Sequence, residues 1–189
     1  MDHFHYRDGQ YFAEGVPLAR IASTVGTPCY VYSRAILEQR WRQFNDAFGD
    51  YPHRIHYAVK ANGNLAILKL LLRMGSGFDI VSGGELERVF KVGGRPDNIV
   101  FSGVGKSESE ITTALENGIH CINIESVAEL DRVNRIAGTL GLVADLALRI
   151  NPDVDPHTHP YISTGLRENK FGIPADQVPD LVRQARDAN

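Results

Sequence analysis

The residue with the clearest chemical potential is Lys60, which follows the apolar run Tyr57-Ala-Val. The run predicts a short strand, and active sites of parallel α/β proteins lie at the carboxyl ends of their strands. Burial against apolar walls lowers the pKa of a lysine and frees its amine to attack a carbonyl carbon. Lysines are mostly exposed, however, so position alone favours a solvated lysine over a catalytic one.

Two other charged residues, Asp79 and Arg149, each stand between bulky apolar neighbours within a predicted strand. A charge in such a place is costly to bury without a partner. Asp79 therefore either caps the turn that follows it or stands beside a cationic centre. Arg149 either forms a structural salt bridge or contacts an anionic or phenolic oxygen. The residues alone leave both choices open.

Two further motifs indicate less than they first suggest. Gly105-Lys-Ser107 fails the spacing of a phosphate-binding loop, because the required first glycine would fall at Val100. We interpret it as a strand-to-helix turn with a helix cap. His157 and His159 lie in a proline-rich loop without a convincing third ligand, so no metal site is expected. The loop 151–170 is long, and such loops often cover active sites.

The elements that must position these residues alternate between short apolar strands and amphipathic helices, from residue 53 onward. Such alternation is typical of a parallel α/β architecture. Strands are expected at Ile55–Val59, Phe78–Val81, Ile99–Phe101, Cys121–Ile124 and Val143–Ile150, and helices at Leu65–Met74, Gly83–Val92, Glu108–Asn117, Val127–Thr139 and Ala175–Ala188.

Three of these helices begin with the same pattern, a serine followed three residues later by a glutamate. In a capping box each of these side chains satisfies a backbone N–H that the helix leaves unpaired. The expected boxes are Ser82 with Glu85, Ser107 with Glu110 and Ser126 with Glu129. Pro174 suits the first turn of the last helix.

The N-terminal residues predict a different arrangement. Phe4–Tyr6 and Gln10–Ala13 flank the turn signal Asp8-Gly9, which indicates a β-hairpin. A short helix is expected from Pro17 to about Val25, a strand at Pro28–Tyr32, and a second helix at Ser33–Phe48.

The fold class is α/β, and two architectures fit the alternation. A doubly wound sheet and a (β/α)8 TIM-type barrel both place a helix after each strand. The chain offers five βα units in 189 residues, whereas a full barrel needs roughly 250 residues. The chain is therefore either an incomplete barrel or a small complete sheet, and periodicity does not decide between them.

Composition and charge narrow the class of protein. The formal net charge of −3 argues against nucleic-acid binding, and no apolar run is long enough to span a membrane. The first residues lack the basic and apolar regions of a secretory signal. Cys29 and Cys121 lie in apolar runs and are expected to be buried, reduced thiols. These features favour a cytoplasmic protein.

Several segments resemble a known family. Residues 57–62, Tyr-Ala-Val-Lys-Ala-Asn, resemble the cofactor-lysine motif of the alanine-racemase-like barrel enzymes that use pyridoxal 5'-phosphate. The segments 78–86, 100–106, 159–166 and 169–173 are similar to diaminopimelate decarboxylases in particular. The resemblance runs over essentially the whole chain, in the right order.

The resemblance implies the roles of single residues. Lys60 would form the Schiff base with pyridoxal phosphate, Asp79 would lie close to the cofactor and the lysine, and Arg149 would approach the cofactor ring. Ser163 and Thr164 in the long loop would touch substrate. Residues 1–32 would be the hairpin and lead-in associated with a separate β domain, and residues 33–189 would form an incomplete cofactor-binding barrel domain.

The resemblance also implies the activity, which is decarboxylation of meso-diaminopimelate to L-lysine by a homodimer with shared active sites. The stacking histidine, the phosphate-binding loop, the glutamate at the pyridine nitrogen and the substrate-binding groups would lie beyond residue 189. The chain alone is therefore expected to be inactive. A basic amino-acid decarboxylase, an amino-acid racemase and a non-catalytic fragment are the alternatives.

Overall fold

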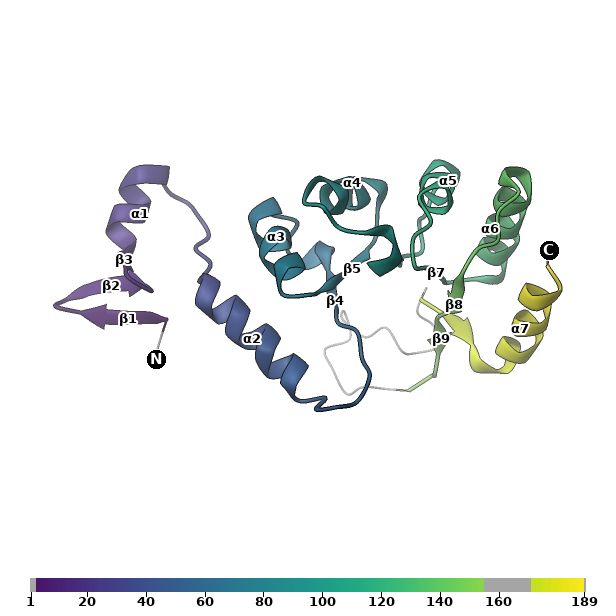
Figure 1. Cartoon of the computed structure of the whole chain (residues 1–189), viewed down its shortest axis with the longest axis horizontal. Helices are drawn as coiled ribbons and strands as arrows, with labels where there is room; N and C mark the ends of the chain where they lie inside the picture. Colours follow the sequence, from purple (N-terminus) through teal and green to yellow (C-terminus); the bar gives the residue numbers. More distant parts are fainter. Residues whose placement is uncertain (1–2, 155–170, 189) are drawn as a thin grey trace. The chain divides into compact units, whose positions relative to one another are not determined.

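The computed structural model describes residues 3–154 and 171–188, and the chain divides into two compact units, Met1–His53 and Arg54–Asn189 (Figure 1). The described part of the first unit contains a three-stranded antiparallel sheet and two helices. In chain order these are β1 (Phe4–Arg7), β2 (Gln10–Ala13), β3 (Val16–Pro17), α1 (Leu18–Val25) and α2 (Arg34–Asp46).

The predicted hairpin is confirmed. Arg7 pairs with Gln10, and the two residues between them, Asp8 and Gly9, have φ angles of 49° and 74°. Positive φ at both central positions is what a two-residue hairpin turn requires. The strand predicted at Pro28–Tyr32 is wrong: this stretch pairs with no strand among the described residues, and Tyr30 is 92% exposed. An apolar run becomes a strand only where a neighbouring strand offers hydrogen bonds.

The second unit is built on a five-stranded parallel sheet, whose strands follow the order of the chain. The strands are β4 (His56–Ala58), β5 (Gly77–Ile80), β6 (Ile99–Phe101), β7 (Cys121–Ile124) and β8 (Leu146–Leu148). The helices between them are α3 (Leu65–Arg73), α4 (Gly83–Lys91), α5 (Glu108–Glu116) and α6 (Val127–Leu140).

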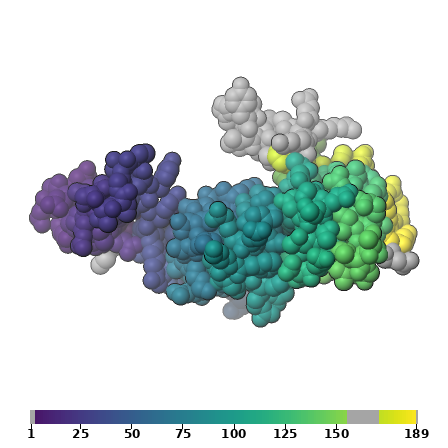
Figure 2. All heavy atoms as spheres, turned by 90° about the horizontal axis from the view of Figure 1, so that it is seen from above, coloured from purple at the N-terminus to yellow at the C-terminus, as the bar shows by residue number. Residues whose placement is uncertain are grey.

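The arrangement of these elements decides between the two architectures. A doubly wound sheet reverses its strand order and carries helices on both faces. Here the order runs from β4 to β8 without reversal, and helices α3 to α6 all lie on one face (Figure 1). Seen from the helix side, they form a continuous covering (Figure 2). The unit is therefore the first part of a barrel, with its inner face opposite the helices.

The core lies between the sheet and the helices, and alternation along each strand creates it. Phe78, Ile80, Ile99, Phe101, Ile122 and Ile124 are each at most 1% exposed. They pack against buried helix residues such as Leu68, Leu86, Ile111 and Val133. The residues between them in the strands, including Asp79, Val100 and Asn123, are only partly buried, because successive side chains point to opposite faces.

Only one of the three predicted capping boxes is complete. All three serines accept a hydrogen bond from the backbone N–H of the matching glutamate, but only Glu110 returns a bond to its own cap residue, Ser107. Glu85 and Glu129 instead accept the N–H one residue earlier, at Val81 and Glu125, over 2.7 Å in each case. These two glutamates therefore fasten the helix start to the end of the preceding strand.

The strand predicted at Val143–Ile150 is interrupted at Arg149, which separates β8 from β9 (Ile150–Asn151). The Arg149 N–H donates to the carbonyl of Ile124, the last residue of β7. The Arg149 carbonyl, in contrast, accepts the Ile173 N–H over 2.7 Å. The chain thus changes its pairing partner at this residue, from β7 to β10 (Ile173–Pro174).

The last helix, α7 (Val178–Asp187), begins later than predicted. Residues 175–177 form a 3₁₀ turn before it. Pro174 therefore precedes the helix, and the proline in its first turn is Pro179.

The cysteines differ from expectation in burial only. Both are free thiols, but Cys29 is exposed, because the extended stretch around it packs against nothing that covers it within the described residues. Cys121 is half-buried at the start of β7, and burial raises the pKa of its thiol. In the described residues, no helix has the length and apolar character that crossing a membrane requires.

Candidate active site

Lys60 lies just beyond the carboxyl end of β4, in the 3₁₀ turn Val59–Ala61. Its neighbour Val59 is 1% exposed and anchors the turn in the core, whereas Lys60 itself is exposed. Within residues 3–154 and 171–188, no hydrogen bond or ion pair engages the Lys60 amine. The amine is therefore accessible at the edge of the sheet where barrel enzymes carry their active sites.

The residues after Lys60 hold this turn in place. Asn62 accepts a hydrogen bond from the Asn64 N–H over 3.0 Å, and its carbonyl accepts one from the Tyr57 hydroxyl over 3.4 Å. Asn64 then caps α3 by accepting the Ala66 N–H over 2.9 Å. The polar residues around Lys60 thus fix the backbone that carries it.

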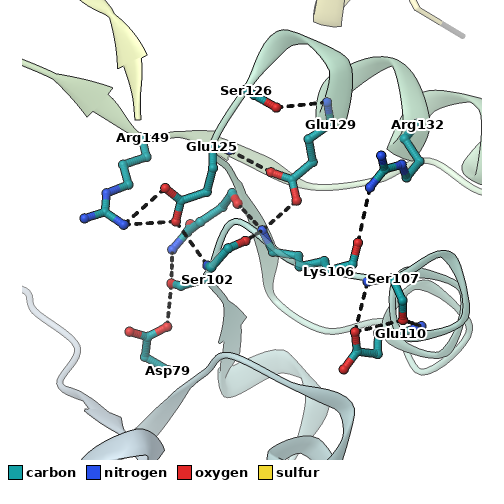
Figure 3. Close-up of polar contacts among 12 residues, drawn as sticks. Asp79, Ser102, Lys106, Ser107, Glu110, Glu125, Ser126, Glu129, Arg132 and Arg149 are labelled. Atoms are coloured by element: carbon teal, nitrogen blue, oxygen red, sulfur yellow. Dashed lines mark hydrogen bonds and ion pairs between the residues drawn. The ribbon is translucent and has the colours of Figure 1, made fainter. Parts of the chain in front are cut away.

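Asp79 occupies the neighbouring strand, where it is paired in register with Ala58, two residues before Lys60. It accepts a hydrogen bond from the Ser102 hydroxyl over 2.6 Å, and Ser102 in turn accepts one from the Asn123 amide over 2.8 Å. This chain of polar side chains crosses the inner face from β5 to β7, and Figure 3 shows the contact of Asp79 with Ser102. The turn after β5 is held by Glu85 instead, so Asp79 is not needed to cap it.

Arg149 forms an ion pair with Glu125, which lies directly after β7. One guanidinium nitrogen, Nη1, is 3.0 Å and 3.1 Å from the two carboxylate oxygens. Glu125 is buried, whereas the Arg149 side chain is 39% exposed and lies over the Phe171 ring at 4.8 Å. The structural salt bridge that the sequence left open is present, and the guanidinium also reaches the surface of the inner face.

Sequence reasoning missed two residues of this cluster, Glu125 and Lys106. Lys106 was interpreted as part of a turn, but its side chain is fully buried against Glu129 (Figure 3). One signal was present: Lys106 immediately precedes the N-terminus of α5, where the helix dipole disfavours a cation. A lysine at that position indicates a compensating carboxylate, although the sequence does not say which one.

The two substrate-contact residues predicted in the long loop, Ser163 and Thr164, lie outside the described residues, as do His157 and His159. Among the residues that are described, no three histidine, cysteine or acidic side chains are grouped to hold a metal ion.

The fold and the exposed lysine agree with a match to a known family. Residues 34–189 match the family described as pyridoxal-dependent decarboxylase, pyridoxal binding domain. The chain belongs to this family, whose members use pyridoxal phosphate as their cofactor.

Similar proteins point to one group within the family. The chain is 60% identical over 186 residues to the diaminopimelate decarboxylase of Vibrio cholerae, covering 98% of this chain and 45% of that protein. The solved diaminopimelate decarboxylase of Helicobacter pylori, complexed with L-lysine, has a TM-score of 0.87 and 44% identity over 90% of this chain and 43% of its own. The solved diaminopimelate decarboxylase of M. jannaschii in complex with L-lysine has a TM-score of 0.91 and 37% identity. That match covers 100% of this chain and 45% of its own. The chain thus spans a little under half the length of these relatives.

The described residues fit pyridoxal phosphate in kind. The Lys60 amine is exposed and unengaged within the described part of the chain, so it is available for a bond to an aldehyde carbon. Arg149 offers N–H donors to oxygens of the cofactor or substrate. Asp79 supplies a carboxylate whose position is fixed by Ser102.

Proposed function

We propose that this chain is the N-terminal part of a diaminopimelate decarboxylase, which releases carbon dioxide from meso-diaminopimelate and forms L-lysine. The observation that carries the proposal is the accessible Lys60 amine at the carboxyl edge of an incomplete barrel, one strand away from Asp79. Identities of 60% and 56% to the Vibrio cholerae and Pseudomonas aeruginosa enzymes support the choice of substrate.

When bound, pyridoxal phosphate supplies an aldehyde that reacts with amines and a ring that takes up the electron pair left by the departing carbon dioxide. Lys60 would hold the cofactor through Nζ. Asp79 would place a negative charge near the cofactor and near the lysine. Arg149 would donate to a phenolic or carboxylate oxygen and so orient the group that carries it.

A basic amino-acid decarboxylase is the second candidate. The solved arginine decarboxylase of Paramecium bursaria Chlorella virus has a TM-score of 0.74 with 27% identity over 90% of this chain. Both values are lower than those of the two lysine-complexed structures, so diaminopimelate is favoured. A racemase would use the same lysine but return a proton instead of releasing carbon dioxide, and no observation favours it.

The proposal includes the assembly and setting of the protein. A homodimer with shared active sites, in the cytoplasm, is proposed from the family resemblance and from the composition. Residues 1–32 are proposed to belong with a β domain, and residues 33–189 to the barrel domain. Size measurement in solution and limited proteolysis of the longer protein test these assignments.

The activity is tested in the longer protein that contains this chain, with meso-diaminopimelate, L-arginine and L-ornithine as separate substrates. We expect carbon dioxide and L-lysine from the first and no product from the others. Lys60→Ala should lower kcat by more than about 10³-fold. Lys91→Ala, which removes an exposed lysine at the end of α4, is the matched control and should leave kcat unchanged.

Other products would contradict the assignment in distinct ways. An amine product from arginine or ornithine would identify a basic amino-acid decarboxylase. Interconversion of enantiomers without carbon dioxide would identify a racemase. Full activity in Lys60→Ala would overturn the central role of the lysine.

A further inference from the structure

Lys106 is the one described cation whose side chain is entirely inaccessible, and the proposed function does not use it. Its ammonium donates to the Gly103 carbonyl over 2.8 Å, the Asn123 carbonyl over 2.7 Å and the Glu129 carboxylate over 2.9 Å. All three of its hydrogens are therefore used. A buried charge is tolerated only with such a full set of partners.

These three acceptors come from three separate parts of the fold. Gly103 follows β6, Asn123 lies in β7, and Glu129 is in the first turn of α6. Gly103 has a φ angle of +106°, a backbone conformation that residues other than glycine rarely adopt. Lys106 thus ties together the carboxyl ends of two strands and the helix behind them.

The network continues from Glu129 to the inner face (Figure 3). The second oxygen of Glu129 accepts the Glu125 N–H over 2.7 Å, and the Glu125 carboxylate accepts the Gly103 N–H over 3.0 Å and holds Arg149. Glu125 and Glu129, which are 4% and 5% exposed, are thus two buried acidic residues of one network. Lys106 and Arg149 are the two cations that compensate them.

Helix α4 of the same unit shows that a glutamate can bind the N–H at the end of the preceding strand without a lysine. Glu85 at the start of α4 accepts the Val81 N–H over 2.7 Å, as Glu129 accepts that of Glu125. Among the described contacts, Glu85 has no ion pair. The buried lysine occurs where the strand end also carries Glu125, the partner of Arg149.

We propose that Lys106 and Glu129 are a positioning pair, which sets the direction of the Arg149 guanidinium through Glu125. The same pair holds the strand ends from which Ser102 and Asn123 reach Asp79. The proposal gives neither residue a contact with cofactor or substrate, because both are buried. The proposal rests on the proposed function, because it assigns Arg149 and Asp79 to that site.

The test compares Glu129→Gln with Glu85→Gln in the longer holoenzyme. Glutamine keeps one oxygen but removes the charge, so both variants can still accept the N–H at the end of the preceding strand. The readouts are the absorption spectrum of the bound cofactor, its change with pH, kcat and KM, and the thermal midpoint. We expect Glu129→Gln to shift the pH profile of the spectrum and to lower kcat/KM by about 10- to 100-fold. Glu85→Gln should change only the thermal midpoint.

Lys106→Met provides the second arm, because it removes the charge at similar length. If the pair acts as one unit, Lys106→Met and the double variant with Glu129→Gln should show the same altered spectrum, since the losses are not additive. Spectra and pH profiles of Glu129→Gln that match those of Glu85→Gln would overturn the proposal. It would also be overturned if both pair variants fail to fold while Glu85→Gln folds, because the pair would then be structural. If the proposed function itself is wrong, the unmodified protein will carry no cofactor on Lys60, which is a separate observation.

Discussion

Glu110 joins the starts of two helices through a single carboxylate. One oxygen accepts the Gly83 N–H of α4 over 2.7 Å, and the other accepts the Ser107 N–H over 2.9 Å. The Gly83 bond, followed by the Ser107 bond, lowers the pKa of the Glu110 carboxyl below its usual value of 4.5. The stability that this residue contributes is therefore present above pH 4.5 and is lost as the pH falls through the lowered pKa.

Glu110→Gln should lower the thermal midpoint at neutral pH, because loss of a helix cap costs on the order of 1 kcal/mol. The difference from the unmodified protein should shrink as the pH is lowered below 4.5. Glu116→Gln, near the carboxyl end of the same helix, is the control and should be neutral or slightly stabilising. A difference in midpoint for Glu110→Gln that stays constant down to pH 3 would contradict this account.

His56 gives a second pH dependence, with the opposite type of group. Burial, followed by the nearby His120 and Arg54, lowers its pKa below 6.5. The rings of His56 and His120 are stacked, with centroids 6.3 Å apart. The folded state resists protonation of His56. Above pH 6.5 the histidine is neutral in both the folded and the unfolded state, so it does not reduce the free energy of unfolding. As the pH drops from 6.5 toward the lowered pKa, the unfolded state takes up the proton first and the stability of the fold falls.

His56→Asn should remove this contribution, so the thermal midpoint should depend less on pH below 6.5 than in the unmodified protein. His53→Asn, which changes a histidine of the first unit, serves as the control. Equal slopes in the His56 variant and the unmodified protein would show that His56 does not titrate in this way.

The sequence predicted the residues that stand out in their own strands, but not their partners. Lys60, Asp79 and Arg149 interrupt apolar runs, so their types and positions were visible. Glu125 and Lys106 act through contacts with residues 24 and 23 positions away, which only the fold brings together.

At the scale of elements, the strand-helix alternation was predicted because polar turns and serine caps mark each boundary. The failures occurred where partners outside the element decide the outcome. The stretch Pro28–Tyr32 has strand-like residues but no described strand to pair with, and the strand at Arg149 breaks because β10 replaces β7 as its partner.

Gly172 tests this change of partner. It has a φ angle of +77°, and an added Cβ would lie 3.0 Å from the Asn151 nitrogen and 3.1 Å from the Arg149 carbonyl oxygen. Gly172→Ala should therefore cost more than the roughly 1–2 kcal/mol of a left-handed backbone alone. Gly141→Ala is the matched control, because φ there is +66° and the added Cβ meets nothing within 4 Å. Denaturant unfolding measures both, and an equal or smaller loss for Gly172→Ala would contradict the close packing of β9 and β10.

At the scale of the whole molecule, the open inner face leads us to expect that the chain on its own is inactive. Asp79, Ser102 and Asn123 lie on that face and remain partly exposed. The chain covers 45% of its Vibrio cholerae relative, so we expect the purified 189-residue chain to form no L-lysine from meso-diaminopimelate. Turnover by this chain at a rate close to that of the longer protein would contradict the expectation.

The barrel was predictable only in part at this scale. Alternation fixed the class as α/β, but both barrels and open sheets show it. The unbroken order from β4 to β8 and the single helix-covered face, which the alternation does not contain, distinguish the barrel from an open sheet.

The most direct test of the central claim is the site at which the cofactor is attached. The longer protein is reduced with borohydride, digested, and the peptide that carries the pyridoxyl group is identified by mass spectrometry. We predict a single labelled residue, Lys60, with no label in Lys60→Ala. Labelling at Lys106 or another lysine, or no labelling in a protein that still decarboxylates diaminopimelate, would contradict the account.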